Sequence, residues 1–127
     1  MTVLIDSWTW IEYFRGSEAG ERAREFIEGD EEAVVSTINL AEVYRWIIRF
    51  YPVEVAEEKV RAMKHRCTVI EVTERIAIES AKLKHRLKLG LEDAIILATA
   101  REMGAKLLTG DPDFKGMEGV VFLGAGD

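Results

Sequence analysis

Cysteine is scarce in this chain of 127 residues, and both an excess of positive charge and long apolar runs are missing; each of these excludes a class of protein. Cys67 is the single cysteine, so no internal disulfide can form and a reducing cytoplasm is the expected compartment. No apolar run reaches the roughly 18 residues of a transmembrane helix. The N-terminal segment MTVLIDSWTW lacks the basic start and the long apolar stretch of a signal peptide. We therefore predict a cytoplasmic protein that does not contact a membrane.

The charge balance is acidic, with 23 Asp and Glu against 17 Lys and Arg and a net charge of −6. Such a balance argues against a protein that coats nucleic acid without specificity, because the phosphate backbone favours basic surfaces. It is compatible with an enzyme that holds cations in an acidic site. Hydrophobic residues make up 48% of the chain, which is enough for one core. Since no linker, repeat or low-complexity tract divides the chain, we predict a single domain over residues 1–127.

Short apolar runs alternate with longer amphipathic segments. The runs predict five strands, at Val3–Ile5, Ala33–Ser36, Thr68–Val72, Lys106–Thr109 and Val120–Leu123. The segments predict six helices, at Ser7–Arg15, Glu18–Glu28, Ile38–Phe50, Val53–Arg66, Thr73–Leu87 and Leu91–Met103. Strands that alternate with helices form parallel sheets covered on both faces. The expected fold class is therefore α/β, a three-layer α/β/α sandwich with a central, mostly parallel sheet.

The aspartates gather at strand ends, whereas most glutamates decorate helix surfaces. Asp6 directly follows the first expected strand, and Asp111 and Asp113 follow the fourth. Asp93 lies in the first turn of the otherwise apolar helix LEDAIILATA. In open parallel sheets, ligands bind at the carboxyl ends of the strands. These four aspartates are therefore candidates for one site.

One glutamate joins this group. Glu42 interrupts the apolar helix in STINLAEVYRWIIRF, about one turn beyond the second strand, and Asn39 precedes it by three residues on the same face. Each acid also has a purely local explanation. These explanations are capping by Asp6, the helix dipole at Asp93, a surface ion pair from Glu42 to Arg45, and turn formation by Asp111 beside Pro112. That four separate segments bring acids to one sheet edge favours a shared site.

Clustered carboxylates raise one another's pKa values unless a cation neutralises them. Hard divalent ions such as Mg²⁺ and Mn²⁺ prefer oxygen ligands and assist phosphoryl transfer. Other chemistries lack their parts: His65 and His85 have no matching zinc ligands, and no GxSxG, Walker A or GxGxxG motif is present. The residues therefore predict a Mg²⁺ or Mn²⁺ site.

Four blocks, LIDSWTWIEYF, STINLAEVY, LEDAIILATA and LLTGDPDF, together resemble the PIN-domain ribonuclease family, especially its VapC-like toxin branch. The resemblance covers almost the whole chain in the right order. It implies a Mg²⁺- or Mn²⁺-dependent endoribonuclease of a toxin–antitoxin system, inhibited by a cognate antitoxin. By position it implies metal-holding catalytic acids at Asp6, Glu42, Asp93 and Asp111, an additional acid at Asp113, and polar neighbours at Thr109 and Asn39. Asp93 is preferred over Glu92 because the family's acid directly precedes a small residue, here Ala94.

RNA binding requires cations, and the segment AKLKHRLKLG concentrates them just before the Asp93 helix. Its alternative role is to complement a helix dipole. The candidates for RNA binding are Lys82, Lys84, Arg86 and Lys88, with Arg15 at the end of the first helix. Aromatic helices around Trp10 and Trp46 carry apolar residues on more than one side, which predicts a partner surface for a homodimer or an antitoxin.

Two rival classes remain open. A receiver-type phosphoacceptor domain shares the length and an acidic Mg²⁺ pocket, but it has an acidic pair near the first strand and a lysine after the last. Here Asp6 stands alone, and VVFLGAGD contains no lysine. A non-catalytic PIN-like module that binds RNA or protein would not need acids at all four matching positions.

Overall fold

The computed structural model describes residues 1–124 and contains one five-stranded sheet. The strands are β1 (Val3–Ile5), β2 (Ala33–Ser36), β3 (Thr68–Ile70), β4 (Lys106–Thr109) and β5 (Val120–Phe122). Their order is β3-β2-β1-β4-β5, and every neighbouring pair is parallel. The predicted fold class is confirmed, and the sheet is parallel throughout.

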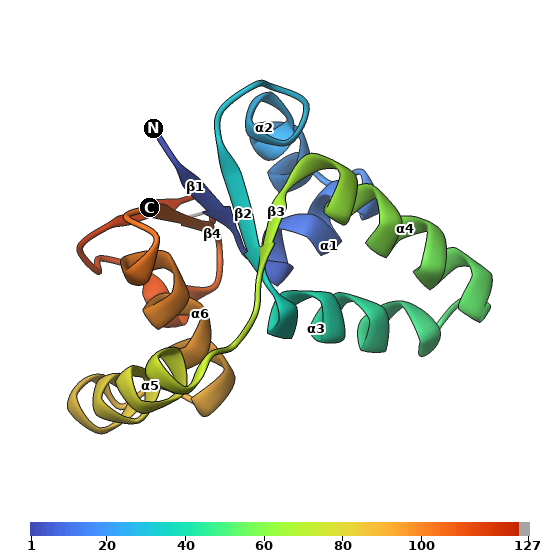
Figure 1. Cartoon of the computed structure of the whole chain (residues 1–127). Helices are drawn as coiled ribbons and strands as arrows, with labels where there is room; N and C mark the ends of the chain where they lie inside the picture. Colours follow the sequence, from blue (N-terminus) through green and yellow to red (C-terminus); the bar gives the residue numbers. More distant parts are fainter. Residues whose placement is uncertain (125–127) are drawn as a thin grey trace.

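Helices cover both faces of this sheet (Figure 1). One face carries α1 (Ser7–Arg15), α2 (Glu18–Ile27), α3 (Thr37–Ile48) and α4 (Val53–Arg66), and the other carries α5 (Glu74–Leu87) and α6 (Leu91–Glu102). Alternation along β1 supplies both cores. Val3 and Ile5 pack with the first group of helices, while Leu4 packs with the second. All three side chains are fully buried, which holds the centre of the sheet rigid.

The predicted bounds of β1, β2, β4, α1 and α4 are confirmed, and where other ends differ, they do so by one to two residues. β3 ends at Ile70 because Ile70 pairs with Ser36, the last residue of β2, so Val72 has no partner strand. α3 begins at Thr37, one residue early, because Ser36 and Asn39 form a capping box. It ends at Ile48 instead of Phe50. The short 3-10 helix η1 (Pro112–Phe114) was not predicted, because three residues give no periodic pattern.

The other differences are of a single residue each. β5 ends at Phe122, the partner of Thr109, so Leu123 is outside the strand. α2 ends at Ile27, α6 ends at Glu102, and α5 begins at Glu74 with Thr73 as its N-cap. Among the described helices, none is both long and apolar enough to cross a membrane.

Candidate active site

The carboxyl edge of the sheet has a topological switch between β1 and β4, its two central strands. Chains leave these two strands on opposite sides, which opens a crevice where ligands bind in doubly wound folds. Asp6 follows β1 directly, and Asp111 follows β4 after Thr109 and Gly110. The fold therefore places two predicted acids at the position where a parallel sheet binds its ligand.

Asp6 is buried and tied to both central strands. Its Oδ1 accepts a hydrogen bond from the Ser7 backbone N–H at 2.8 Å, which makes it the N-cap of α1. Its Oδ2 accepts a bond from the Thr109 hydroxyl at 2.7 Å. Only 4% of its surface is exposed. Helix capping, offered above as an alternative role for Asp6, therefore coexists with a place in the site.

The turn after β4 is held by its own polar groups. The Asp111 N–H donates to Thr109 Oγ1 at 3.0 Å, and the Asp113 N–H donates to Asp111 Oδ1 at 3.0 Å. A Cβ on Gly110 would lie 2.2 Å from the ring of Trp8, so only glycine fits beneath that indole. The same turn that these polar groups and Gly110 stabilise therefore also positions Asp111 at the edge of the sheet.

Three aspartates of this edge come together as one potential metal site. Asp93, Asp111 and Asp113 each offer an oxygen, and these oxygens all lie within 4.8 Å of one another. An all-oxygen donor set from short carboxylates on a rigid edge suits a hard divalent cation such as Mg²⁺ or Mn²⁺. Glu92 is outside this group, and the choice of Asp93 as the catalytic acid stays a prediction.

Glu42 reaches the edge from α3 through a chain of hydrogen bonds. The Ser7 hydroxyl donates to Glu42 Oε1 at 2.6 Å and accepts a bond from Asn39 Nδ2 at 2.8 Å. Asn39 Oδ1 in turn accepts the Ser36 backbone N–H at 2.8 Å. Asn39 therefore contacts Glu42 indirectly, through the Ser7 hydroxyl, and its role in the site stays a prediction. Ser7 was missed, because a serine in the first turn of a helix carries no signal of its own.

Burial and mutual repulsion raise the pKa values of the acids. Burial brings the pKa of Asp6 to about 6, although hydrogen bonds from Thr109 and Ser7 oppose the rise. Burial, followed by the charges of Asp111 and Asp6, raises the pKa of Asp93 to about 7. Burial, and then the contact with Glu92, raises the pKa of Glu42 to about 8. Each of these shifts would be relieved by a bound cation.

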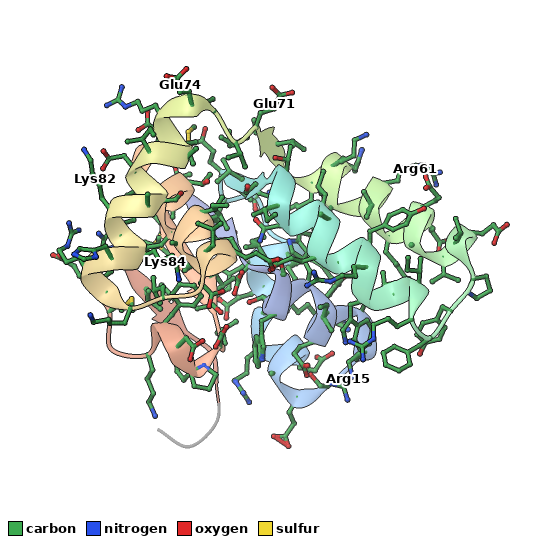
Figure 2. All side chains as sticks on the ribbon, turned by 90° about the horizontal axis from the view of Figure 1, so that it is seen from below. Arg15, Arg61, Glu71, Glu74, Lys82 and Lys84 are labelled. Atoms are coloured by element: carbon green, nitrogen blue, oxygen red, sulfur yellow. The ribbon has the colours of Figure 1, made fainter. Side chains whose placement is uncertain are left out.

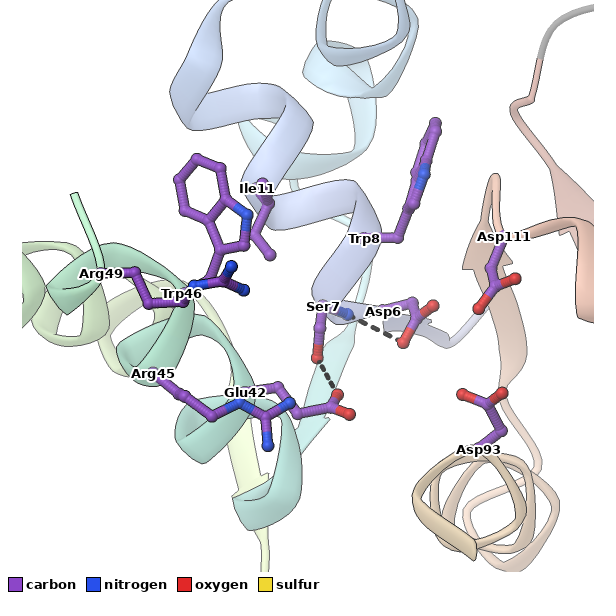
Figure 3. Close-up of a pocket in the computed structure, with 10 residues that line it drawn as sticks. All are labelled: Asp6, Ser7, Trp8, Ile11, Glu42, Arg45, Trp46, Arg49, Asp93 and Asp111. Atoms are coloured by element: carbon purple, nitrogen blue, oxygen red, sulfur yellow. Dashed lines mark hydrogen bonds between the residues drawn. The ribbon is translucent and has the colours of Figure 1, made fainter. Parts of the chain in front are cut away.

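A cavity of about 200 Å³ opens over these acids (Figure 3). Asp93 and Asp111 line one side of it, and residues of α1 and α3 line the other. The full lining is Asp6, Ser7, Trp8, Ile11, Glu42, Arg45, Trp46, Arg49, Asp93 and Asp111. Below, "the acidic cavity" means this set.

Arg45 and Arg49, which were not predicted, are the cations that line the acidic cavity among the described residues. The expected pair of Arg45 with Glu42 is replaced by an ion pair with Glu92, whose nearest atoms are 3.7 Å apart. Both arginines lie on α3 or at its C-cap, four residues apart. Sequence spacing alone could have indicated them, since they lie three and seven residues after Glu42.

The predicted basic residues do not line the acidic cavity. Lys82 and Lys84 lie along α5, apart from Arg15 at the end of α1 (Figure 2). Arg86 lines a different cavity, between α5 and α6. Local contacts occupy three of the five: Lys82 with Glu79, Arg15 with Glu12, and Lys84 Nζ with the Leu89 carbonyl. Lys88 is the C-cap of α5 in the left-handed conformation. Their role in RNA binding stays a prediction.

Comparisons with known proteins identify a family and similar folds. A family model described as "PIN domain" matches residues 3–120. A chain of a toxin–antitoxin complex from Klebsiella pneumoniae is similar, with 30% identity, a TM-score of 0.79, and coverage of 95% of this chain and 97% of that one. A comparison with curated protein sequences gave no match.

Two further structures share the fold at lower identity. One is VapBC2 from Rickettsia felis bound to a promoter DNA fragment, with 17% identity, a TM-score of 0.74, and coverage of 96% and 97% of the two chains. The other is VapC20 from Mycobacterium tuberculosis, described as a toxin that cleaves the sarcin–ricin loop. It has 17% identity, a TM-score of 0.69, and coverage of 82% and 85%. A receiver-type domain is excluded, because receiver domains have the strand order 2-1-3-4-5, whereas the order in this chain is β3-β2-β1-β4-β5.

Proposed function

The chain belongs to the PIN domain family, and from that premise we propose that it is a divalent-metal-dependent endoribonuclease that hydrolyses RNA phosphodiester bonds. The observation that carries the proposal is the aspartate group, whose three oxygen ligands lie within 4.8 Å of one another at the switch point of the sheet. Such a group is costly to maintain without a cation, because like charges at this separation repel.

The side chains divide the work of the reaction. Asp93, Asp111 and Asp113 would hold Mg²⁺ or Mn²⁺ directly, with Asp6 beside them, fixed by Thr109. A cation bound there would lower the pKa of water and offset the charge that develops on the phosphoryl oxygens. Glu42 is oriented by Ser7 and faces the same cavity. Its carboxylate could therefore hold a water molecule bound to the metal, or accept a proton from that water.

The proposed biological role is that of a toxin inhibited by a cognate antitoxin. The support is the similarity, at 30% identity and over nearly the full length of both chains, to a chain from a toxin–antitoxin complex. The chain would also self-associate as a homodimer through its exposed apolar residues. A short reading frame for a small protein beside this gene would support the toxin role.

Cleavage of RNA with and without metal tests the proposed activity. Purified protein should cut RNA with Mg²⁺ or Mn²⁺, and EDTA should stop it. A panel that includes structured ribosomal and transfer RNA is needed, because a selective enzyme would ignore most sequences. Cleavage that persists in EDTA would contradict the metal mechanism. Binding of RNA without cleavage of any member of the panel would favour a non-catalytic PIN-like module.

Asp6→Asn separates this activity from a contaminating nuclease. The substitution removes one charge while the remaining oxygen can still cap α1 through the Ser7 N–H. We expect cleavage to be lost while the fold is kept, and Mg²⁺ to raise the melting temperature much less than in the wild type. Asp30→Asn is the matched control, because Asp30 is exposed and lies in the turn before β2. An active Asp6→Asn protein would contradict the proposed role of this carboxylate.

A further inference from the structure

An RNA strand that enters the acidic cavity meets strong negative charge. Four carboxylates line the cavity, and Asp113 lies beside them. One divalent cation does not neutralise all of these groups, so the phosphates on either side of the scissile bond would still be repelled. Productive binding therefore needs fixed positive charge at the rim of the cavity itself.

Arg45 and Arg49 supply that charge from α3. Four residues apart, they lie on the same side of the helix. Figure 3 shows both reaching the cavity from the side opposite Asp93 and Asp111. The side chain of Arg45 is 66% exposed, and Arg49 is also exposed, so both guanidinium groups are accessible to a ligand.

The contacts that these arginines make are readily exchanged. The Arg45–Glu92 pair spans 3.7 Å between partly exposed groups, a type of pair worth at most about 1 kcal/mol. The Arg49 guanidinium carbon lies 5.4 Å from the centre of the Phe50 ring, a contact that leaves its N–H donors available. Guanidinium groups bind phosphates through two parallel hydrogen bonds, which are stronger than either existing contact.

We propose that Arg45 and Arg49 form a phosphate-binding row that holds the RNA backbone beside the scissile bond. This inference rests on the proposed nuclease function and adds to it the residues that position the substrate. It also differs from the prediction based on the basic segment of α5, whose residues do not line the acidic cavity. In this arrangement the two arginines of α3 bind phosphates that flank the cleavage site, while the aspartates face the phosphate that reacts.

Salt dependence of RNA binding tests the row directly. A fluorescent, unstructured RNA oligonucleotide is titrated with protein by anisotropy, with Ca²⁺ in place of Mg²⁺ and RNA integrity checked on gels. The plot of log affinity against log KCl concentration has a slope of about −0.7 for each phosphate contact to a single strand. The double variant Arg45→Ala, Arg49→Ala should therefore make the slope shallower by about 1.4.

Three companion variants make the result specific. Arg61→Ala on α4 removes one arginine charge away from the acidic cavity and should leave the slope unchanged (Figure 2). Replacement of both row arginines by lysine should keep the slope and lose only part of the affinity, because charge remains without the planar fork. Lys82→Ala together with Arg86→Ala reports on the α5 segment. A larger change in slope there than in the row variant would overturn the inference.

Kinetics with Mg²⁺ distinguish failure of the row from failure of the function. Loss of phosphate contacts should raise KM with little change in kcat. Wild-type cleavage combined with an unchanged slope in the double alanine variant would refute the row and leave the nuclease function intact. Lower affinity with an unchanged slope would likewise refute it, as a structural effect. If the wild type neither binds nor cuts any RNA, both proposals fall.

Discussion

Asp6 shows that a helix cap can also be part of the proposed metal site. One carboxylate oxygen caps α1 and the other accepts the Thr109 hydroxyl, so the side chain has no rotational freedom. Local sequence rules identify Asp6 correctly as a helix cap. A correct cap assignment is no argument against a second role, because the cap uses only one of the two carboxylate oxygens. The deciding information is the bond to Thr109, which is 103 residues away.

Gly110 gives a prediction at the same scale. Gly110→Ala would force its Cβ against the Trp8 ring, 2.2 Å from the nearest atom, and should cost about 1–3 kcal/mol of unfolding free energy. Cleavage should fall too, because the turn that presents Asp111 must move. In a Trp8→Ala background the same substitution should cost much less, since the ring is gone. Chemical denaturation of the four proteins measures this coupling, and equal costs in both backgrounds would rule out the clash.

At the level of elements, the site depends on how α1 and α3 meet. The Ser7 hydroxyl connects them, because it receives Asn39 Nδ2 and donates to Glu42 Oε1. Both Ser7 and Asn39 are buried, so neither can replace a lost partner with bulk water.

Ser7→Ala should therefore destabilise the protein and reduce cleavage. It leaves an Asn39 amide hydrogen without its acceptor, at a cost of about 1–3 kcal/mol, and frees Glu42 to rotate. Ser80→Ala is the control, since Ser80 is equally buried but bonds only the Ile76 carbonyl in its own helix. Thermal melts and cleavage rates of both variants provide the comparison. Undiminished activity of Ser7→Ala would mean that Glu42 needs no such support.

For the whole molecule, the raised pKa values predict how stability depends on pH. Asp6, Asp93 and Glu42 hold protons more tightly when folded, with pKa values of about 6, 7 and 8. Their contribution is fully present below the unfolded pKa near 4 and is lost as the pH rises through the folded values. Metal-free protein should thus be less stable at pH 8 than at pH 5. Of the contribution of buried Asp6, which is about 3 kcal/mol below pH 4, about 1.4 kcal/mol remains at pH 5 and is lost by pH 8.

Melting curves in EDTA and in Mg²⁺ at several pH values check this expectation. Mg²⁺ should raise the melting temperature more at pH 8 than at pH 5, because its ligands must lose protons. At ten times the dissociation constant the gain is about 1.4 kcal/mol. Asp93→Asn should flatten both trends. If the melting temperature of the wild type and of the variant depended on pH in the same way, the raised pKa of Asp93 would be contradicted.

Self-association is the second prediction for the whole molecule. Trp10 itself is only 1% exposed and packs in the core, so any contribution of its helix to the predicted partner surface comes from other residues. Four exposed apolar side chains lie close together in the sequence where α3 connects to α4, at Ile48, Phe50, Tyr51 and Val53. Light scattering at concentrations on the order of 10 μM should detect a dimer, and Phe50→Glu should dissociate it. Ile78→Glu on α5 is the exposed control. If the wild type is monomeric, the homodimer prediction is wrong, and we would expect this surface to bind an antitoxin instead.

Sequence alone determined the class of fold and the edge where the acids meet. Alternating apolar runs and amphipathic segments specify a parallel sheet. Asp6 comes directly after β1, and Asp111 and Asp113 lie within four residues of the end of β4, so their placement follows from local order. Glu42 and Asp93 could be predicted as polar exceptions on apolar helices. These features depend on neighbours within one helical turn or one strand, which is the range that sequence patterns describe.

Tertiary structure decided what each residue contacts. The bond of Ser7 to Glu42, the packing of Trp8 on Gly110, and the position of Arg45 and Arg49 at the acidic cavity join segments 35 to about 100 residues apart. The basic segment of α5 was a stronger charge pattern than the two arginines, yet it lies outside the acidic cavity. The density of charge along a chain does not determine which charged side chains reach a given cavity. That is decided by the packing of α3 and α5 on opposite faces of the sheet.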